Sequence, residues 1–280
     1  MKTSSFTHDG HRLVYDEYGG GSRPMILLPG LLLPRTMHHA LASALATRGN
    51  RVIVPDLLGH HESDRPEEMW HYAMPLFAEQ VVGLMDHLEL DEAVIGGTSL
   101  GANVTLETLV LAPDRARGAV IEMPVLDNAL VACAIVFAPM LVALTLGQPL
   151  VRMASRAARI VPRGPMHMVN VGLDWVAQDP KPSASYLQGL FFGRIAPPGS
   201  ERRQIKTPAL VLGHPRDPLH PFSDADALVH EMPNARLVEA GSILEMRMSP
   251  KRLTDEIAQF LDDCWKPARA KRRQGRAATA

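Results

Sequence analysis

Short, continuous apolar runs alternate along the chain with longer segments in which apolar residues recur every three or four positions. The runs indicate strands covered on both faces, and the longer spacing indicates amphipathic helices. Strands are predicted at residues 11–18, 24–28, 51–55, 93–95, 117–123, 208–212 and 235–239. Helices are predicted at residues 36–47, 74–90, 100–111, 223–231 and 250–265. This alternation predicts an α/β fold with a doubly wound, mostly parallel sheet.

The alternation stops between residues 124 and 203, where no strand pattern is visible and Ala, Leu and Met are frequent. We therefore predict a core made of residues 1–123 and 204–265, interrupted by a helical cap at 124–203. Residues 266–280 follow as a basic tail.

One segment of the predicted cap, residues 128–151, is uncharged throughout. Its length and composition alone would allow a transmembrane helix. Because Pro139 interrupts it and the rest of the chain has a soluble α/β pattern, we expect a buried or cap helix pair broken at Pro139. A cap resting on a membrane surface is the less favoured alternative.

Charge and cysteine content limit the classes of partner and compartment. The net charge is −1, but the tail carries six basic and no acidic residues. The remaining 23 basic residues face 30 acidic ones, a balance of −7, which argues against a nucleic-acid-binding body. We expect the tail to be a disordered, solubilising extension. Two cysteines and a start without an apolar leader predict a cytoplasmic protein.

The strongest chemical signal is the G-x-S-x-G sequence at residues 97–101, which contains Ser99. A predicted buried strand runs into it and an apolar helix leaves it. This is the strand–turn–helix context of a nucleophile elbow, in which a sharp turn exposes the serine Oγ at a helix N-terminus. Ser99 is the candidate nucleophile.

With this motif, residues 6–265 resemble the α/β-hydrolase superfamily, and further segments match in order. Pro29-Gly30-Leu31 after the strand at 24–28 is similar to the family's oxyanion loop, with Pro29 in the place of its histidine. The resemblance implies that the backbone N–H groups of Leu31 and Leu100 form the oxyanion hole. Residues 55–64 are similar to the family's D-x-x-G-x-x-x-S-D loop, whose His and Asp residues we interpret as scaffolding.

The family's acid follows the strand after the cap, and Asp217 stands at that position. The family's histidine follows the last strand, but Ser242 stands there and no histidine follows His230. A serine hydroxyl cannot act as a general base near neutral pH. Another histidine could supply the base, and we rank His220 first because it shares a loop with Asp217. The other candidates are His38, His39, His167 and His214.

Two further accounts of Ser242 remain open. The chain could be a degenerate relative that binds an apolar ligand without turnover, or Ser242 could be an introduced substitution in a working enzyme. Glu122, at the end of the strand before the cap, is a candidate alternative acid, a polar anchor for substrate or an ion-pair partner for the cap. His38, His39, Glu122 and Ser242 are thus candidate pocket residues.

The resemblance implies a serine hydrolase that cleaves an apolar ester or a related acyl compound through an acyl-enzyme on Ser99. The superfamily also includes carbon–carbon bond hydrolases and perhydrolases, so the bond stays open. The cap, rich in aliphatic residues with Phe137, Phe191 and Phe192, suits a small apolar substrate. We expect no cofactor, no metal and no nucleic-acid partner, and the sequence leaves the oligomeric state open.

Overall fold

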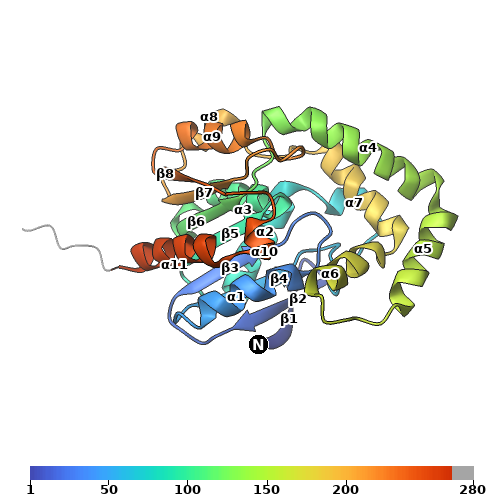
Figure 1. The fold of residues 1–280 in the computed structure, drawn as a ribbon, viewed down its shortest axis with the longest axis horizontal. Helices are drawn as coiled ribbons and strands as arrows, with labels where there is room; N and C mark the ends of the chain where they lie inside the picture. Colours follow the sequence, from blue (N-terminus) through green and yellow to red (C-terminus); the bar gives the residue numbers. More distant parts are fainter. Residues whose placement is uncertain (267–280) are drawn as a thin grey trace, which may run out of the picture.

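The computed structural model describes residues 1–266 and contains a twisted eight-stranded sheet (Figure 1). The order across the sheet is β1-β2-β4-β3-β5-β6-β7-β8. The strands are β1 (Lys2–His8), β2 (His11–Tyr18), β3 (Pro24–Leu28), β4 (Arg51–Asp56), β5 (Ala93–Thr98), β6 (Ala116–Glu122), β7 (Ala209–Gly213) and β8 (Ala235–Glu239). β2 pairs antiparallel with β1 and β4, and the other pairings are parallel. The predicted mostly parallel α/β sheet is confirmed.

Helices cover both faces of the sheet, as expected for parallel strands without a solvated face. The core helices are α1 (His39–Ala46), α2 (Met74–His87), α3 (Leu100–Leu111), α9 (Phe222–Glu231), α10 (Glu245–Met248) and α11 (Lys251–Trp265). Short 3-10 turns lie at Arg35–His38, Met69–His71, Pro113–Arg115 and Asp127–Ala129. Apolar residues of α2 and α3 share one buried cluster with β3 and β5, and those of α1 and α11 share another with β4 and β6.

The first strand was not predicted. β1 is mostly exposed, with Phe6 its one buried residue, so it carries no continuous apolar run that would distinguish it from a loop. Its hydrogen bonds to β2 form the strand, from Lys2 opposite Glu17 to His8 opposite His11. β1 therefore adds an antiparallel edge to the parallel sheet.

Between β6 and β7 the chain forms the helical insertion, most of which lies at one end of the sheet (Figure 1). Its helices are α4 (Leu130–Leu146), α5 (Gln148–Ile160), α6 (His167–Val176), α7 (Pro180–Phe192) and α8 (Gly199–Arg202). α4 packs along α7, and Leu144 contacts Ala184 and Leu187 in a small buried cluster. The basic tail, apart from Lys266, lies outside the described residues.

The uncharged segment differs from the prediction in two ways. α4 runs without a break through Pro139, and the turn to α5 comes at Gly147. Asp127–Leu146 is long and apolar enough to cross a membrane by length and composition, yet only 17% of its most apolar window is buried. The expected helix pair broken at Pro139 is therefore wrong, and much of α4 faces outward. The proline is tolerated because it costs a helix one hydrogen bond and a local clash, which neighbouring contacts can offset.

Candidate active site

Ser99 lies at the sharp turn between β5 and α3. Its backbone has φ 55° and ψ −112°, an unusual conformation for a residue with a side chain. The Ser99 N–H donates to the carbonyl of Glu122 at 2.9 Å, and the Ser99 carbonyl accepts from Asn103 N–H at 3.1 Å. Both neighbouring elements thus fix the turn that presents the hydroxyl.

The two glycines of the motif are required by close backbone contacts. A Cβ on Gly97 would lie 2.4 Å from the carbonyl carbon of Gly101, and a Cβ on Gly101 would lie 2.4 Å from the carbonyl oxygen of Leu28. Real Cβ atoms do not approach backbone atoms this closely. The G-x-S-x-G pattern therefore reflects how closely α3 starts against β3 and β5.

Ser99, His220 and Asp217 form a continuous chain of hydrogen bonds. Ser99 Oγ lies 2.8 Å from His220 Nε2, and His220 Nδ1 lies 2.9 Å from Asp217 Oδ2. An ionised carboxylate can only accept, so Nδ1 carries the proton and Nε2 accepts from the Ser99 hydroxyl. The three side chains thus have the relative arrangement of a nucleophile, a base and an orienting acid.

The loop that carries Asp217 and His220 is fixed by its own backbone. Asp217 Oδ1 accepts from the N–H groups of Leu219 at 2.9 Å and His220 at 3.0 Å. Burial disfavours the charged carboxylate, but the hydrogen bonds and charge of His220 together with these N–H donors hold the pKa of Asp217 below its ordinary value. Asp217 therefore stays ionised and holds the imidazole in one orientation.

The sequence named the backbone N–H groups of Leu31 and Leu100 as donors of an oxyanion hole. Leu31 and Leu100 both line the cavity that Ser99 faces. Leu100 begins α3, where N–H groups have no acceptor within the helix. In residues 1–266 the N–H of Leu31 has no hydrogen-bond partner, whereas that of Leu32 donates to His60 Nε2 at 3.1 Å. These two groups are thus free to bind an oxyanion.

The D-x-x-G loop, residues 55–64, contacts the segment around Leu31. The buried Asp56 pairs with Arg35 Nη1 at 2.5 Å and accepts from Arg35 N–H at 2.7 Å. His60 is buried next to the carbonyl of Gly30, and burial lowers its pKa to about 4. A neutral His60 contacts the loop on both sides of Leu31. These contacts match the scaffolding role expected for the loop.

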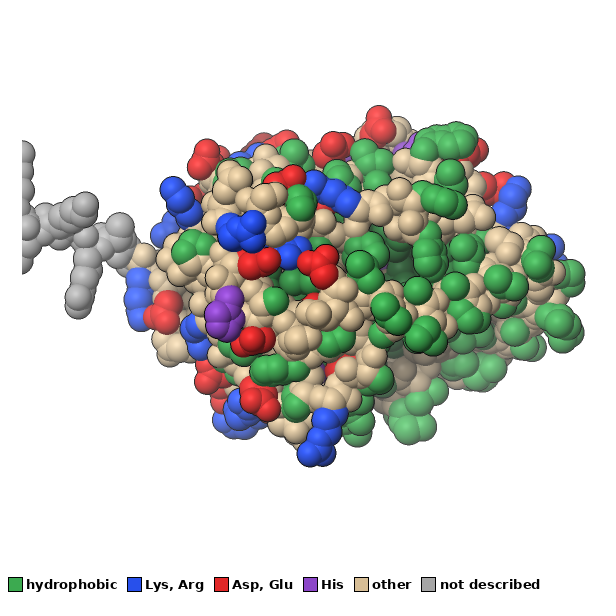
Figure 2. All heavy atoms as spheres, turned by 90° about the horizontal axis from the view of Figure 1, so that it is seen from above, with side chains coloured by type: hydrophobic (Ala, Val, Ile, Leu, Met, Phe, Trp, Pro, Cys, Tyr) green, Lys and Arg blue, Asp and Glu red, His purple; other side chains and the backbone are tan. Residues whose placement is uncertain are grey.

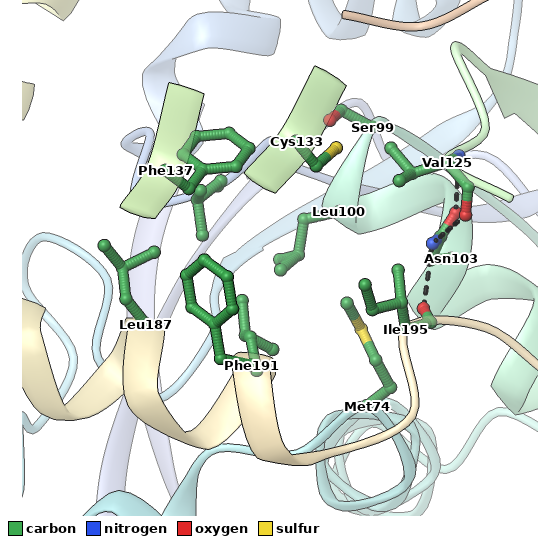
Figure 3. Close-up of a pocket in the computed structure, with 12 residues that line it drawn as sticks. Met74, Ser99, Leu100, Asn103, Val125, Cys133, Phe137, Leu187, Phe191 and Ile195 are labelled. Atoms are coloured by element: carbon green, nitrogen blue, oxygen red, sulfur yellow. Dashed lines mark hydrogen bonds between the residues drawn. The ribbon is translucent and has the colours of Figure 1, made fainter. Parts of the chain in front are cut away.

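An apolar cavity opens in front of Ser99 (Figure 3). Phe137, Leu187 and Phe191 converge on it from the insertion. The complete lining is Leu31, Met74, Ser99, Leu100, Asn103, Val125, Cys133, Phe137, Leu187, Leu190, Phe191 and Ile195. Among the described residues, no Asp, Glu, Lys or Arg lines this cavity. The cavity therefore suits an apolar, uncharged ligand.

Asn103, which sequence reasoning missed, holds both ends of the insertion beside Ser99. Its amide nitrogen donates to the carbonyls of Val125 at 2.7 Å and Ile195 at 2.8 Å, and its oxygen accepts from Val125 N–H at 3.0 Å. An amide side chain in the first turn of a mostly apolar helix was the available sequence signal. Because both amide protons are engaged, Asn103 leaves no donor for a ligand.

Glu122 does not line the cavity. It is buried in a polar cluster with Thr98, His214 and Arg247, in which Arg247 Nη2 lies 3.0 Å and His214 Nε2 lies 3.3 Å from its carboxylate. Burial disfavours the charge, yet Arg247 and His214 hold the pKa of Glu122 well below its usual range. Burial likewise opposes charge on His214, and Glu122 raises its pKa. Glu122 therefore forms ion pairs, but with Arg247 of α10 and His214 in the core and not with the cap, as one sequence interpretation had expected.

The remaining candidate pocket residues also lie away from the cavity lining. Ser242 is exposed, and its carbonyl accepts from His214 Nδ1 at 3.1 Å. His38 is buried against the Leu28 carbonyl at 3.0 Å, and burial lowers its pKa to about 4. His39 is exposed beside Tyr18, and His167 Nε2 lies 2.7 Å from the Thr36 carbonyl. Of the histidines considered, His220 contacts Ser99.

Among known proteins, sequence similarity is confined to part of the chain. The family model described as alpha/beta hydrolase fold matches residues 23–140. A haloalkane dehalogenase of Mycolicibacterium paratuberculosis is 29% identical over 92 residues, which are 33% of this chain and 31% of that protein. A 2-hydroxymuconate semialdehyde hydrolase of Pseudomonas sp. is 34% identical over 70 residues, 25% of this chain and 24% of that protein. The matches therefore span about a quarter to a third of these relatives.

Similarity of structure extends over nearly the whole chain. The crystal structure of the enol-lactonase from Burkholderia xenovorans superposes with a TM-score of 0.74 at 23% identity, covering 92% of this chain and 100% of that one. At this identity the likeness concerns the fold, and together with the family match it covers the sheet, the elbow and the insertion. The chain therefore has the α/β-hydrolase fold, and its residues 23–140 match the family model of that name.

Proposed function

We propose that the protein is a serine hydrolase that cleaves uncharged, apolar esters or related acyl compounds through an acyl-enzyme on Ser99. The contact of Ser99 Oγ with His220 Nε2 at 2.8 Å, in front of an apolar cavity, carries this proposal. His220, which lies on the same loop as Asp217, then acts as the base in place of the histidine that is missing at position 242. The named relatives, a dehalogenase, a semialdehyde hydrolase and an enol-lactonase, show that related proteins catalyse varied hydrolyses.

In the first half-reaction, Ser99 Oγ attacks the carbonyl carbon while its proton moves to His220 Nε2. The imidazolium is stabilised by the Asp217 carboxylate, which stays ionised. The carbonyl oxygen becomes an alkoxide and receives hydrogen bonds from the N–H groups of Leu31 and Leu100, an interaction worth several kcal/mol of barrier. When the intermediate collapses, His220 returns its proton to the leaving alcohol and the acyl group remains on Ser99.

In the second half-reaction, water takes the place of the alcohol. His220 Nε2 accepts a proton from the water, whose oxygen attacks the acyl carbon, and the same two N–H groups bind the second alkoxide. Collapse breaks the bond to Ser99, and the proton on His220 returns to its Oγ. The carboxylic acid leaves and the site is restored.

The cavity favours acyl groups without charge. Phe137, Leu187 and Phe191 contribute apolar surface, and the amide protons of Asn103 are engaged by backbone carbonyls. An anionic acyl group would lose its hydration without gaining a cation. Each additional buried methylene should instead contribute about 0.8 kcal/mol to transition-state binding.

A series of p-nitrophenyl esters tests the substrate class. We expect kcat/KM to rise about twofold to fourfold per methylene from acetate to hexanoate, and the hemisuccinate ester to be a poor substrate. Phe137→Ala should flatten this rise, whereas Phe192→Ala, at an 81% exposed position outside the cavity lining, should leave it unchanged. A preference for acetate or for the anionic ester would contradict the proposed class. Hydrolysis retained by Ser99→Ala would contradict the proposed nucleophile.

A further inference from the structure

α4 is apolar on both of its faces, although only one face is covered. Cys133, Phe137, Met140 and Leu144 follow one face and pack against the cavity and α7. Val131, Ile135, Val142 and Leu146 follow the other at helical spacing and are 54–83% exposed. A helix that is apolar all round is normally buried in protein or lipid. The outer face of α4 is therefore an apolar surface that no other part of the described chain covers.

The exposed apolar surface continues onto α5. Leu150, Met153 and Ile160 lie on one stripe of this helix and are 64–82% exposed. Together with the four outer residues of α4 they form what we call the α4–α5 face. Figure 2 shows hydrophobic side chains gathered over the insertion, around a hollow. Exposed apolar patches of this kind mark protein-interaction or membrane-contact sites.

Positive charge borders this face. Arg152, Arg156 and Arg159 follow the neighbouring stripe of α5 and line a hollow that Asp179 shares, but within the described residues none of them forms an ion pair within 4.0 Å. Residues 128–162 contain these three arginines and no acidic residue, whereas the next arginine, Arg163, pairs with Asp174. An apolar stripe flanked by arginines is the composition of helices that lie in the interface of anionic bilayers.

We propose that the α4–α5 face docks on the surface of an anionic phospholipid bilayer. Two copies of the chain joined through this face by a twofold axis would bring like-charged rims together, whereas anionic headgroups complement them. Docking leaves α4 in its place, because Cys133 and Phe137 on its inner face line the cavity. A membrane-crossing α4 would have to leave that position.

One wall of the cavity is formed by the inner face of α4, through Cys133 and Phe137. Phe191 lines the cavity and is 42% exposed, and its neighbour Phe192 is 81% exposed. An apolar molecule dissolved in the bilayer could enter along these side chains, a consequence that rests on the proposed function. The docking itself does not require catalysis.

Vesicle flotation with full-length Ser99→Ala protein tests docking separately from turnover. We expect binding to vesicles of equal parts phosphatidylcholine and phosphatidylglycerol, much weaker binding to phosphatidylcholine alone, and release by high salt. Ile135→Gln combined with Leu146→Gln should lower partitioning at least about tenfold. Leu111→Gln combined with Met248→Gln removes two exposed apolar side chains from the core and should change nothing.

A second pair of variants tests the charge. Arg152→Gln combined with Arg156→Gln should lower anionic-vesicle binding about tenfold or more, whereas Lys206→Gln should not. Circular dichroism melts verify that each variant is folded. Absence of flotation by the folded protein would overturn the proposal. Unchanged flotation of the α4 variant, which combines Ile135→Gln with Leu146→Gln, would overturn it too. Sedimentation showing a dimer that the α4 variant dissociates, without vesicle binding, would assign the face to a second copy instead.

Discussion

Asp217 and His220 are three residues apart on one loop, and their side chains meet with 2.9 Å between Oδ2 and Nδ1. The same carboxylate accepts the N–H of His220, so the acid fixes both the backbone and the ring of the base. A triad normally collects its acid and base from different segments. Here one short loop after β7 supplies both, so residues 240–266, which follow β8, supply neither of them.

Asp217→Asn tests the orienting role. An asparagine amide can donate to Nδ1 and stabilise the wrong tautomer, in which Nε2 carries the proton and cannot accept from Ser99. We expect kcat for ester hydrolysis to fall about 10²–10⁴-fold, with KM changed much less. Initial-rate kinetics measure this split. An equal loss with Asp226→Asn, an exposed control on α9, would show that the effect is not specific to the triad.

Ser242→His tests whether the family's usual position still matters. From the sequence alone, a histidine there would be expected to restore a missing base and raise the rate about tenfold or more. The structure changes that expectation, because His220 already contacts Ser99 and Ser242 is exposed. We predict less than about a twofold change in the esterase rate. A tenfold gain would mean that His220 does not serve as the base.

The elbow glycines should be needed for stability. Gly97→Ala would force a Cβ to within 2.4 Å of the Gly101 backbone, and we expect it to lower the free energy of unfolding by at least about 2 kcal/mol. Gly172→Ala in α6, where no heavy atom lies within 4 Å of the added Cβ, should be neutral or stabilising by up to about 1 kcal/mol. Urea titrations compare the two. Equal effects would contradict the close-contact account.

The buried Glu122–His214 pair should give a defined pH dependence of stability. Glu122 raises the folded-state pKa of His214 above its ordinary value of about 6.5. The free energy of unfolding that the Glu122–His214 pair contributes is therefore fully present below a pH of about 6.5. It is lost as the pH rises through the folded-state pKa of His214. His214→Gln should cost more unfolding free energy at pH of about 6 than at about 9. Urea titrations at both pH values test this, and a constant cost would contradict the assignment.

The sequence predicted the parts of the fold that have continuous apolar runs or a motif with strict local geometry. β3, β5 and the elbow at Ser99 belong to this group, because burial on both faces and close glycine contacts leave few residue choices. β1 was not predicted because an exposed edge strand has no continuous apolar run. Asp217 and the choice of His220 followed from chain order, since both lie on the loop after a parallel strand.

Other features depend on three-dimensional contacts that no local pattern records. Arg247 lies far along the chain from Glu122, yet its guanidinium engages that carboxylate within the core. α4 is apolar on every side, so periodicity could not show which residues face water. Pro139 predicted a break that the structure does not have, because a proline weakens a helix without determining where it ends.

Labelling with a fluorophosphonate probe shows whether His220 activates Ser99. We expect the wild-type protein to be labelled, Ser99→Ala to stay unlabelled, and His220→Gln to be labelled at least about 10²-fold more slowly. His39→Gln, which changes an exposed histidine outside the cavity lining, should be labelled at the wild-type rate. Intact-protein mass spectrometry over time gives these rates. A wild-type protein that takes up no probe, or a His220→Gln variant labelled as fast as wild type, would contradict the account.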